Sequence, residues 1–452
     1  MRWLRRFSPP ERIAMPQSTP RPSSGYLVGG AVRDALLGTP ARDVDWVVPR
    51  PEEEARRAAE ALTAEDSRAT AFALDARRGH WRVVAGGLTC DYTPLAGPLE
   101  EELRRRDFTV NAVAADLDGH LIDPLGGIAD LRARRLRMTS ETSLTDDALR
   151  PLRGVRLSAT LALELEPATR DAIRRLARQQ ADGERPLPAW ERIRDELDLL
   201  LLDASAARGL LLADELGLLD AVLPELAMCR GVEQGGFHHL DVLRHSLEAL
   251  HQLVQGFPDA DPALRWATLL HDIGKPATKA RGEDDRTHFY GHARLGQRLA
   301  QSALARLREP QARIRRVGLL VRYHMLPLPK GERAARRFVH RRAELLPDLL
   351  ELMIADREAA RGPLASEANR QAYRLALAQV LAILSEAPER PPLLDGEAVM
   401  RLLAIGPGPR VGEALRLVRE AEAVGDVATP EEAAELLRRY AAAQGWQRER
   451  HE

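Results

Sequence analysis

The chain has 452 residues, of which 44% are hydrophobic and 29% are charged, so it is long enough for roughly two to four globular domains. Its two cysteines, Cys90 and Cys229, are too few for a disulfide framework or a cysteine-rich zinc site, and we expect a reducing compartment, the cytoplasm. No apolar run approaches the roughly 18 to 20 residues of a membrane span, and the first residues lack the apolar core of a secretory signal. The net charge of −1 does not by itself indicate a nucleic-acid partner, although arginines gather locally, as at 333–342.

The pattern along the chain predicts an α+β protein. Residues 1–24 are basic and rich in proline and serine, so we expect a disordered extension in which Met15 is an alternative start. Residues 25–138 alternate short β-rich runs with helical stretches, which predicts an α/β domain. From residue 139 apolar residues recur at helical spacing, and clusters of glycine and proline divide this part into the regions 139–235, 236–360 and 361–452.

The first motif is YLVGGAVRDALLGTPARDVDWVV, which predicts a strand, a turn at Gly29 and Gly30, a helix, and a second strand. The glycines let the backbone approach phosphate oxygens, and the N-terminus of the helix favours negative charge there. Alternate residues of a strand share a face, so Asp43 and Asp45 point to one spot and suit Mg²⁺. Either half of the motif alone is more often structural. Together they predict a nucleotide-binding site with catalytic aspartates.

A second motif, TDDALRPLRGVRLSA, covers residues 145–159. Asp147, Arg150 and Arg153 have the spacing of one helical face, with Arg156 one step further. A carboxylate acceptor beside arginine donors can imitate the hydrogen-bonding edge of a partner base. This stripe predicts selection of a nucleotide without a template, and the alternative is an exposed row of helical salt bridges.

These segments, together with RRDFTVNA (105–112) and ERIRDEL (191–197), resemble the class II tRNA nucleotidyltransferases, the bacterial CCA-adding enzymes and their poly(A) polymerase relatives. The resemblance covers most of the chain. It implies a polymerase-beta-like α/β head followed by an extended all-helical neck, a further helical domain and a tail. It also implies tRNA and CTP as substrates, Mg²⁺ at the transferase site, and no membrane partner.

The resemblance also assigns roles to single residues. Asp43 and Asp45 would hold two catalytic metal ions. The residues that would bind the nucleotide are Gly29, Gly30, Arg33 and Arg106 at the phosphates, Asp107 and Asn111 at the ribose, and Asp147, Arg150, Arg153 and Arg156 at the base. One departure is mild, because the base-selecting motif begins with Asp146 where the family usually has glutamate.

The larger departure is a short connection. Between TCDYTP (89–94) and RRRDFTVNA the chain has only LAGPLEEEL (95–103), where CCA-adding relatives carry a long flexible segment. In the family this loop helps the pocket change from CTP to ATP, and its loss marks enzymes that stop after two cytidines. We therefore expect a CC-adding enzyme, with a separate A-adding enzyme acting on the product.

Three alternatives to CC addition remain at this point. Full CCA addition with CTP and ATP requires that some other element permits the change of nucleotide. A poly(A) polymerase on the same fold would use ATP alone. A catalytically inactive RNA-binding scaffold is disfavoured, because carboxylates clustered at a cost in mutual repulsion have no structural reason to persist.

The segments 238–250 and 269–279 both read as helices, and the pair His271-Asp272 ends an apolar stretch. Histidine and carboxylate together suit a divalent metal ion, and His245 and Asp356 are the candidates that complete its ligands. This order resembles the HD-superfamily phosphohydrolases, which implies a second, phosphohydrolase activity. The metal stays open among Mg, Mn, Ni and Co. Further residues that would bind a second metal or the substrate phosphate are Lys275, His292 and His324.

Residues 394–441 read as amphipathic helices around a GPGPRVG turn. They resemble the tail that grips tRNA in relatives, which makes 361–452 a candidate tRNA-binding region. A plain helical scaffold is the alternative.

Overall fold

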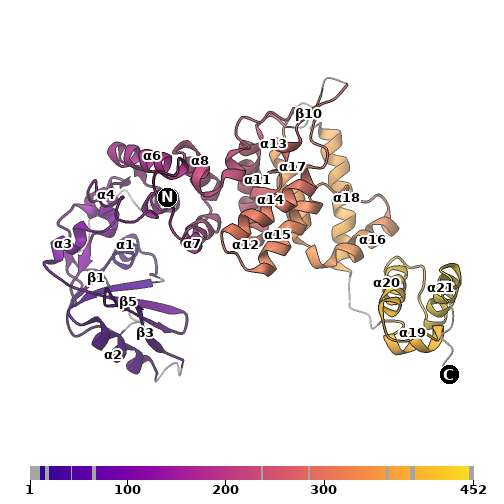
Figure 1. The fold of residues 1–452 in the computed structure, drawn as a ribbon, viewed down its shortest axis with the longest axis horizontal. Helices are drawn as coiled ribbons and strands as arrows, with labels where there is room; N and C mark the ends of the chain where they lie inside the picture. The colour runs from indigo at the N-terminus through magenta and orange to yellow at the C-terminus, as the bar shows by residue number, and fades with distance from the viewer. Residues whose placement is uncertain are drawn as a thin grey trace. The chain divides into compact units, whose positions relative to one another are not determined.

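A computed structural model describes residues 11–15, 20–41, 43–63, 68–235, 238–283, 286–362, 366–386 and 392–446. The chain forms two compact units, one of Met1–Ala227 with Arg306–Glu309 and one of Met228–Ala305 with Pro310–Glu452 (Figure 1). The first unit combines a sheet with helices and the second is mostly helical, which confirms the α+β class. Within the described residues, no helix is both long and apolar enough to span a membrane.

The described part of the first unit contains a seven-stranded sheet, in the order β3-β4-β5-β2-β1-β6-β7. β2 and β5 are parallel, and the other neighbours are antiparallel. The strands are β1 (Tyr26–Val28), β2 (Asp43–Val48), β3 (Thr70–Asp75), β4 (His80–Ala85), β5 (Leu88–Pro94), β6 (Ala114–Ala115) and β7 (Leu121–Ile122). A separate parallel pair joins β8 (Arg135–Leu136) to β9 (Glu164–Leu165). The predicted strand, turn, helix and strand are confirmed, with the helix at Gly30–Leu37.

The two faces of this sheet differ because side chains alternate along each strand. On one face Trp46 and Tyr92 are fully buried, and helix α2 (Pro51–Thr63) packs across β3, β4 and β5 through small residues such as Ala55. The opposite face carries Asp43 and Asp45. The other helices of this part are α1 (Gly30–Leu37), α3 (Leu99–Arg104), the 3₁₀ helix η2 (Thr109–Asn111) and α4 (Gly127–Arg132). Burial of alternate residues therefore leaves the carboxylate face free for a ligand.

The rest of the first unit is helical. Its helices are α5 (Arg150–Thr160), α6 (Pro167–Ala181), α7 (Trp190–Leu201), α8 (Ala206–Glu215), α9 (Leu218–Val222) and α10 (Pro224–Ala227). Asp147 was expected on the same helix as Arg150 and Arg153, but α5 begins at Arg150 with a proline in its first turn. Asp147 lies just before it, and its carboxylate accepts a hydrogen bond from the Leu149 backbone at 3.0 Å.

Residues 11–15 differ from the disordered extension expected for 1–24. Ile13 and Met15 are buried, and the Ile13 backbone donates to the carbonyl of Gly119 at 3.0 Å. Residues 1–10 and 16–19 lie outside the described residues. The apolar side chains of this segment therefore belong to the head.

The second unit begins with a group of helices that carries the histidines. Its elements are α11 (Val242–Gly256), α12 (Pro262–Leu270), α13 (Lys275–Thr278), β10 (Ala280–Arg281), β11 (Thr287–His288), α14 (His292–Arg306), α15 (Gln311–Tyr323), α16 (Glu332–Arg342), η3 (Ala343–Leu345), α17 (Asp348–Ala359) and α18 (Glu367–Ser385). Helix α11 begins at Val242, capped by Asp241, so the helix expected from residue 238 begins later. His271 and Asp272 follow α12 directly.

Three further helices, α19 (Gly396–Leu403), α20 (Pro409–Ala423) and α21 (Pro430–Ala443), share an apolar core of their own that includes Val399, Ala414 and Leu437. These helices confirm the amphipathic reading of residues 394–441. Their apolar faces pack on one another, so their polar faces are left for contacts with α16 and with solvent.

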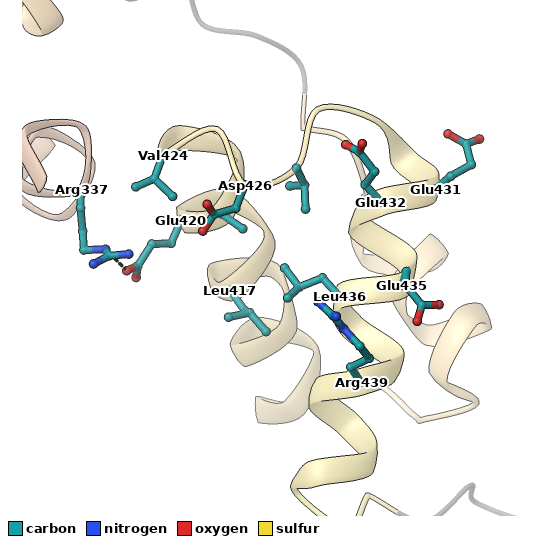
Figure 2. Close-up of a pocket in the computed structure, with 12 residues that line it drawn as sticks. Arg337, Leu417, Glu420, Val424, Asp426, Glu431, Glu432, Glu435, Leu436 and Arg439 are labelled. Carbon is teal, nitrogen blue, oxygen red and sulfur yellow. Dashed lines mark ion pairs between the residues drawn. The ribbon is translucent and has the colours of Figure 1, made fainter. Parts of the chain in front are cut away.

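The arginines of α16 meet carboxylates of these last helices. Arg337 and Arg341 both pair with Glu420, at 3.0 and 2.6 Å, and Arg333 pairs with Asp426 at 2.6 Å. Figure 2 shows the pocket of about 730 Å³ beside these pairs, where most of the charged lining residues are acidic. Part of the basic cluster at 333–342 is thus neutralised within the chain.

Gly127 provides a test of how the head is held together. A Cβ at this position would lie 2.0 Å from the Thr109 carbonyl oxygen, which is backbone and cannot move aside. We expect Gly127→Ala to destabilise the head by about 1–3 kcal/mol, the usual cost of overpacking, measured as a lower melting temperature. Gly97→Ala is the control, because its Cβ would meet only a glutamate tip at 3.6 Å. Equal melting temperatures for the two variants would contradict this packing.

Candidate functional site

The carboxylates of the head gather on one face of the sheet. Asp43 and Asp45 share a face of β2, and the parallel pairing with β5 places Asp91 directly opposite Asp45. Burial raises the pKa of Asp45 above its ordinary value, and the charges of Asp91 and Asp43 raise it further, while Arg106 opposes them. Crowded carboxylate oxygens of this kind fit a hard divalent cation such as Mg²⁺.

Asp91 was missed in the sequence. It stands in the β-rich run TCDYTP, where a lone aspartate carries no signal until β5 is known to pair with β2. Arg82 of β4 lies opposite it and donates two hydrogen bonds to its carboxylate, both at 2.7 Å. This bidentate pair fixes the position of Asp91.

The glycine turn lies against the same carboxylates. Gly29 has a φ of 76°, which favours glycine, and a Cβ there would meet Arg106 Nη1 at 2.7 Å and Asp45 Oδ2 at 2.9 Å. Any larger residue would push this arginine and this aspartate apart. Helix α1 starts at Gly30 directly after the turn, so its free backbone N–H groups begin beside the arginine.

The predicted ribose residues form one hydrogen-bonded chain. Arg33 Nη1 donates to Asn111 Oδ1 at 2.6 Å, and Asn111 Nδ2 donates to Asp107 Oδ1 at 2.9 Å. Asp107 Oδ2 lies 3.6 Å from Arg153 Nη1. The structure therefore brings together residues that are about 120 positions apart, from Arg33 to Arg153.

Glu196 of α7 is a second residue that was missed. It is 5% exposed, and its two oxygens accept hydrogen bonds from Arg153 Nε at 2.8 Å and Arg156 Nε at 2.6 Å. Burial alone would lower the pKa of Arg153, but Glu196 and Asp107 raise it above its ordinary value. The segment ERIRDEL contained this glutamate, although nothing in the sequence showed which arginines it holds.

The two remaining residues of the predicted base-reading stripe have partners within the chain. Asp147 Oδ2 lies 2.5 Å from Arg192 Nη2 of α7, and this arginine keeps the pKa of Asp147 below its ordinary value despite partial burial. Arg150 Nη1 donates to the Ser143 carbonyl. The hydroxyl of Ser143 in turn donates to the Asp107 carbonyl at 3.2 Å, so this end of the stripe adjoins the ribose residues.

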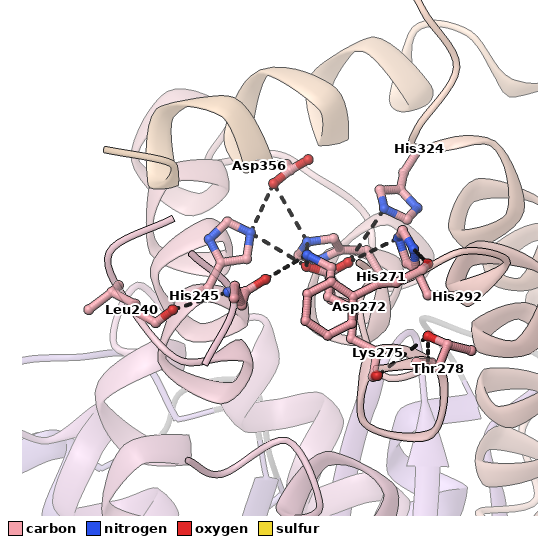
Figure 3. Close-up of polar contacts among 12 residues, drawn as sticks. Leu240, His245, His271, Asp272, Lys275, Thr278, His292, His324 and Asp356 are labelled. Atoms are coloured by element: carbon pink, nitrogen blue, oxygen red, sulfur yellow. Dashed lines mark hydrogen bonds and ion pairs between the residues drawn. The ribbon is translucent and has the colours of Figure 1, made fainter. Parts of the chain in front are cut away.

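The second constellation lies in the second unit (Figure 3). His245 Nε2 is 2.9 Å from Asp356 Oδ1, and His271 Nε2 is 3.1 Å from Asp272 Oδ2 and 3.7 Å from Asp356 Oδ1. Helices α11 and α17 and the turn after α12 thus bring these four predicted ligands together. His292 and His324 approach Asp272 Oδ1 at 3.4 and 3.6 Å from the other side.

The histidine nitrogens are oriented as metal ligands. Nδ1 of each of His271, His292 and His324 donates a hydrogen bond to a backbone carbonyl at 2.8 Å. Nδ1 therefore carries the proton, and the lone pair of Nε2 points into the cluster. All three Nε2 atoms and Asp272 Oδ1 are buried and make no hydrogen bond. Buried polar atoms without partners are costly, and a bound metal ion would satisfy them. The ligand set fits a divalent metal.

The charges of the cluster favour a cation as well. Burial alone would lower the pKa of His271, but Asp272 and Asp356 raise it to about 10. The pKa of Asp272 is held well below its ordinary value, against burial, by His271 and Lys275. The buried carboxylate of Asp272 and the partly buried one of Asp356 thus attract positive charge, which protons supply in the absence of metal.

Lys275 lies in this cluster but not in the open. Its Nζ donates to Asp272 Oδ2 and to Gln234 Oε1, both at 2.6 Å. His238, which was not singled out from the sequence, packs edge-on against His245 with ring centroids 4.4 Å apart. Burial, aided by Lys275, lowers the pKa of His238 to about 3, so this ring is neutral.

Comparison with known proteins decides the family. An A-adding tRNA nucleotidyltransferase of Deinococcus radiodurans is 53% identical over 428 residues, covering 94% of this chain and 98% of that protein. The chain belongs to the tRNA nucleotidyltransferases. It is therefore an enzyme of the class II type expected from its motifs. A CC-adding tRNA nucleotidyltransferase of Thermus thermophilus is 44% identical and covers 92% of this chain and 93% of that protein.

Three family models match parts of this tRNA nucleotidyltransferase. They are the Poly A polymerase head domain at residues 25–137, the Probable RNA and SrmB- binding site of polymerase A at residues 162–229, and the HD domain at residues 242–361. The structure of a Bacillus stearothermophilus CCA-adding enzyme in complex with CTP is similar in fold, with a TM-score of 0.63 and 24% identity, covering 93% of this chain and 94% of that one. The polymerase-type head and the HD domain are thus both shown.

The two constellations lie in different units and should fail separately. We expect Asp43→Ala to lower nucleotide addition about 1,000-fold or more, because it removes a carboxylate that would hold a divalent cation at the reacting phosphate, and to leave bound metal in the HD domain unchanged. His271→Ala should leave nucleotide addition intact and lower the metal content of the purified chain, measured by elemental analysis. Loss of both properties in either variant would contradict two independent sites.

Glu196 should matter through the arginines that it holds. Glu196→Gln removes the charge opposite Arg153 and Arg156, so we expect the KM for the nucleotide to rise about 10-fold with little change in the KM for tRNA. Asp195→Asn is the matched control, because Asp195 is exposed and, among the described residues, pairs only with its neighbour Arg194 at 2.7 Å. An unchanged nucleotide KM in Glu196→Gln would show that Arg153 and Arg156 do not contribute to nucleotide binding.

Proposed function

We propose that this enzyme adds two cytidines to the 3′ end of tRNA from CTP and then stops. The observation that carries this proposal is the short connection between Pro94, where β5 ends, and Leu99, where α3 begins. Only residues 95–98 join the two elements, next to the strand that carries Asp91. A pocket without a long mobile segment keeps one shape, and one shape favours one nucleotide.

The residues of the head divide the work of nucleotidyl transfer. The backbone at Gly29 and Gly30 and the guanidinium groups of Arg33 and Arg106 would hold the triphosphate at the start of α1. Divalent metal ions held by Asp43 and Asp45, with Asp91 beside them, would supply charge neutralisation at the reacting phosphate and at the 3′-hydroxyl. The protein therefore contributes mainly position and fixed charge.

The nucleotide would be chosen by fixed side chains. Asp107 and Asn111 would meet the ribose, and Asp147 and Arg150 would meet the base edge. Because Glu196 holds Arg153 and Arg156 in place, this surface is rigid before the nucleotide binds. Rigid donors and acceptors of this kind can select one base without a template.

Addition of the terminal adenosine is the second candidate. It is favoured by the 53% identity with an A-adding enzyme, against 44% with a CC-adding one. Both candidates are enzymes with one specificity and need a partner enzyme for the remaining step. The short connection disfavours full CCA addition. Poly(A) synthesis is disfavoured because both of these relatives are tRNA nucleotidyltransferases.

We also propose a metal-dependent phosphohydrolase activity for the HD domain and a cytoplasmic location for the enzyme. The ligands would be His245, His271, Asp272 and Asp356, holding Mg²⁺, Mn²⁺, Ni²⁺ or Co²⁺. A phosphate would approach through His292 and His324, whose free nitrogens face Asp272. Residues 361–452 would contact tRNA.

An extension assay separates the candidates for the head. We would offer tRNA transcripts that end at the discriminator base, after the first C or after CC, each with CTP, ATP or both nucleotides. CC addition predicts two added cytidines and then a stop, even with ATP present, because the pocket cannot change its shape. Extension of the CC-ended transcript with ATP, and no use of CTP, would establish the second candidate instead. Completion from the discriminator base to CCA would contradict both.

A further inference from the structure

One straight row of side chains crosses four strands of the head sheet. Phe72 of β3 lies opposite Arg82 of β4, Arg82 opposite Asp91 of β5, and Asp91 opposite Asp45 of β2. Directly opposed residues project to the same face of a sheet. Three strand spacings of about 4.8 Å place Phe72 roughly 14 Å from Asp45, along the face that carries the catalytic aspartates.

The outer end of this row is apolar and open. Phe72 is 42% exposed, and Val84, which lies diagonally across from it, is 39% exposed. Large apolar side chains on the other face are covered, since α2 packs there and Arg56 lies over the Trp81 ring at 5.4 Å. Phe72 and Val84 thus form a small exposed apolar patch at the outer end of the row.

The nucleotide residues lie on the other side of the aspartates. Gly29 follows β1, and β1 flanks β2 on the side away from β5. In an in-line transfer the attacking oxygen and the leaving pyrophosphate lie on opposite sides of the reacting phosphorus. With the triphosphate beside β1, the attacking 3′-hydroxyl has to come from the side of β5, β4 and β3. The RNA end therefore passes over Arg82 toward Phe72.

We propose that Phe72, with Val84 beside it, is a stacking platform for the bases next to the 3′ end of the RNA that is extended. This assignment rests on the proposed nucleotidyl transfer and adds the residues that hold its acceptor. An aromatic ring stacks on any base, so the platform accepts the RNA end without reading its sequence.

The charges around the platform suit RNA. Arg82 lies between the ring and the carboxylates, and Arg77 and Arg78 are exposed in the turn that joins β3 to β4. Arg82 stays paired with Asp91, and the exposed guanidinium groups of Arg77 and Arg78 can meet the phosphates that follow the stacked bases. At the other end of the row, the carboxylates of Asp91 and Asp45 would attract the metal ions that meet the 3′-hydroxyl of the RNA. The row thus changes from apolar and basic to acidic toward the reacting end.

The test compares steady-state extension of tRNA by the full chain and by Phe72→Ala. We expect the KM for tRNA to rise about 5- to 100-fold, the range for loss of one base–aromatic contact, with kcat and the nucleotide KM little changed. Phe72→Trp should keep the wild-type KM, because the larger ring still stacks. Ala73→Ser is the matched control, since Ala73 is exposed on the same strand but points to the opposite face.

A binding measurement tests the stacking directly. A tRNA with 2-aminopurine as its penultimate base should lose fluorescence on binding to the wild-type chain and to Phe72→Trp, but much less on binding to Phe72→Ala. Phe72 is exposed, so equal melting temperatures are expected for all variants. If Phe72→Ala nevertheless folds poorly, the comparison of fluorescence loss between the wild-type chain and Phe72→Trp decides instead.

The outcomes separate this inference from the function on which it rests. If the wild-type chain extends tRNA and Phe72→Ala extends it with the same KM, the platform is wrong and the transferase proposal stands. If the wild-type chain extends no RNA, the proposed function falls and the platform falls with it. β3 is an edge strand of the described sheet, and such a strand can also pair with a second copy of the chain. If the wild-type chain is a dimer, and Phe72→Ala is a monomer with an unchanged KM for tRNA, this face binds a second copy and the platform is wrong.

Discussion

The parallel pairing of β2 with β5 is the constraint on which the transferase site depends. It places Asp91 opposite Asp45, beside Asp43, and turns a pair of aspartates into a crowded acidic face. Burial and then the charges of Asp91 and Asp43 raise the pKa of Asp45, so a bound cation would stabilise the ionised carboxylates. The same register continues through Arg82 to Phe72, so strand pairing would set both the proposed metal-binding edge and the proposed path of the acceptor.

Buried charge also joins the helices of the first unit to its sheet. Glu196 of α7 holds two arginines of α5, and Arg153 in turn lies 3.6 Å from Asp107, the residue proposed to meet the ribose. A buried carboxylate that lost these partners would be costly, so these contacts would hold the helices at a fixed distance from the proposed nucleotide pocket. A rigid frame of this kind is consistent with an enzyme of a single specificity. The arginines of α16 pair with Glu420 and Asp426 in the second unit, but these pairs are partly exposed and hold their helices less strongly.

The HD domain also places charged and polar groups where only a cation would satisfy them. Backbone carbonyls near the ends of α12 and α15 accept hydrogen bonds from Nδ1 of His271 and His324, which turns the Nε2 atoms toward Asp272. A bound metal ion would satisfy these nitrogens and pair with the ionised carboxylate of Asp272. Each site of this enzyme is thus built from groups that are unfavourable alone and favourable with a cation.

The sequence by itself determined the α+β class, the strand with Asp43 and Asp45, and the adjacent pair His271-Asp272 at the end of an apolar stretch. These features rest on local spacing, because side chains two apart share a strand face and His271 adjoins Asp272 in the chain. Asp91, Glu196, His238 and Phe72 needed the tertiary structure, and so did the start of α5 after Asp147. Their roles come from strand register and helix packing, which bring distant residues together, as with Asp45 and Asp91 or with Glu196 and Arg156. Short-range periodicity carries no record of such pairings, so only the folded chain could decide them.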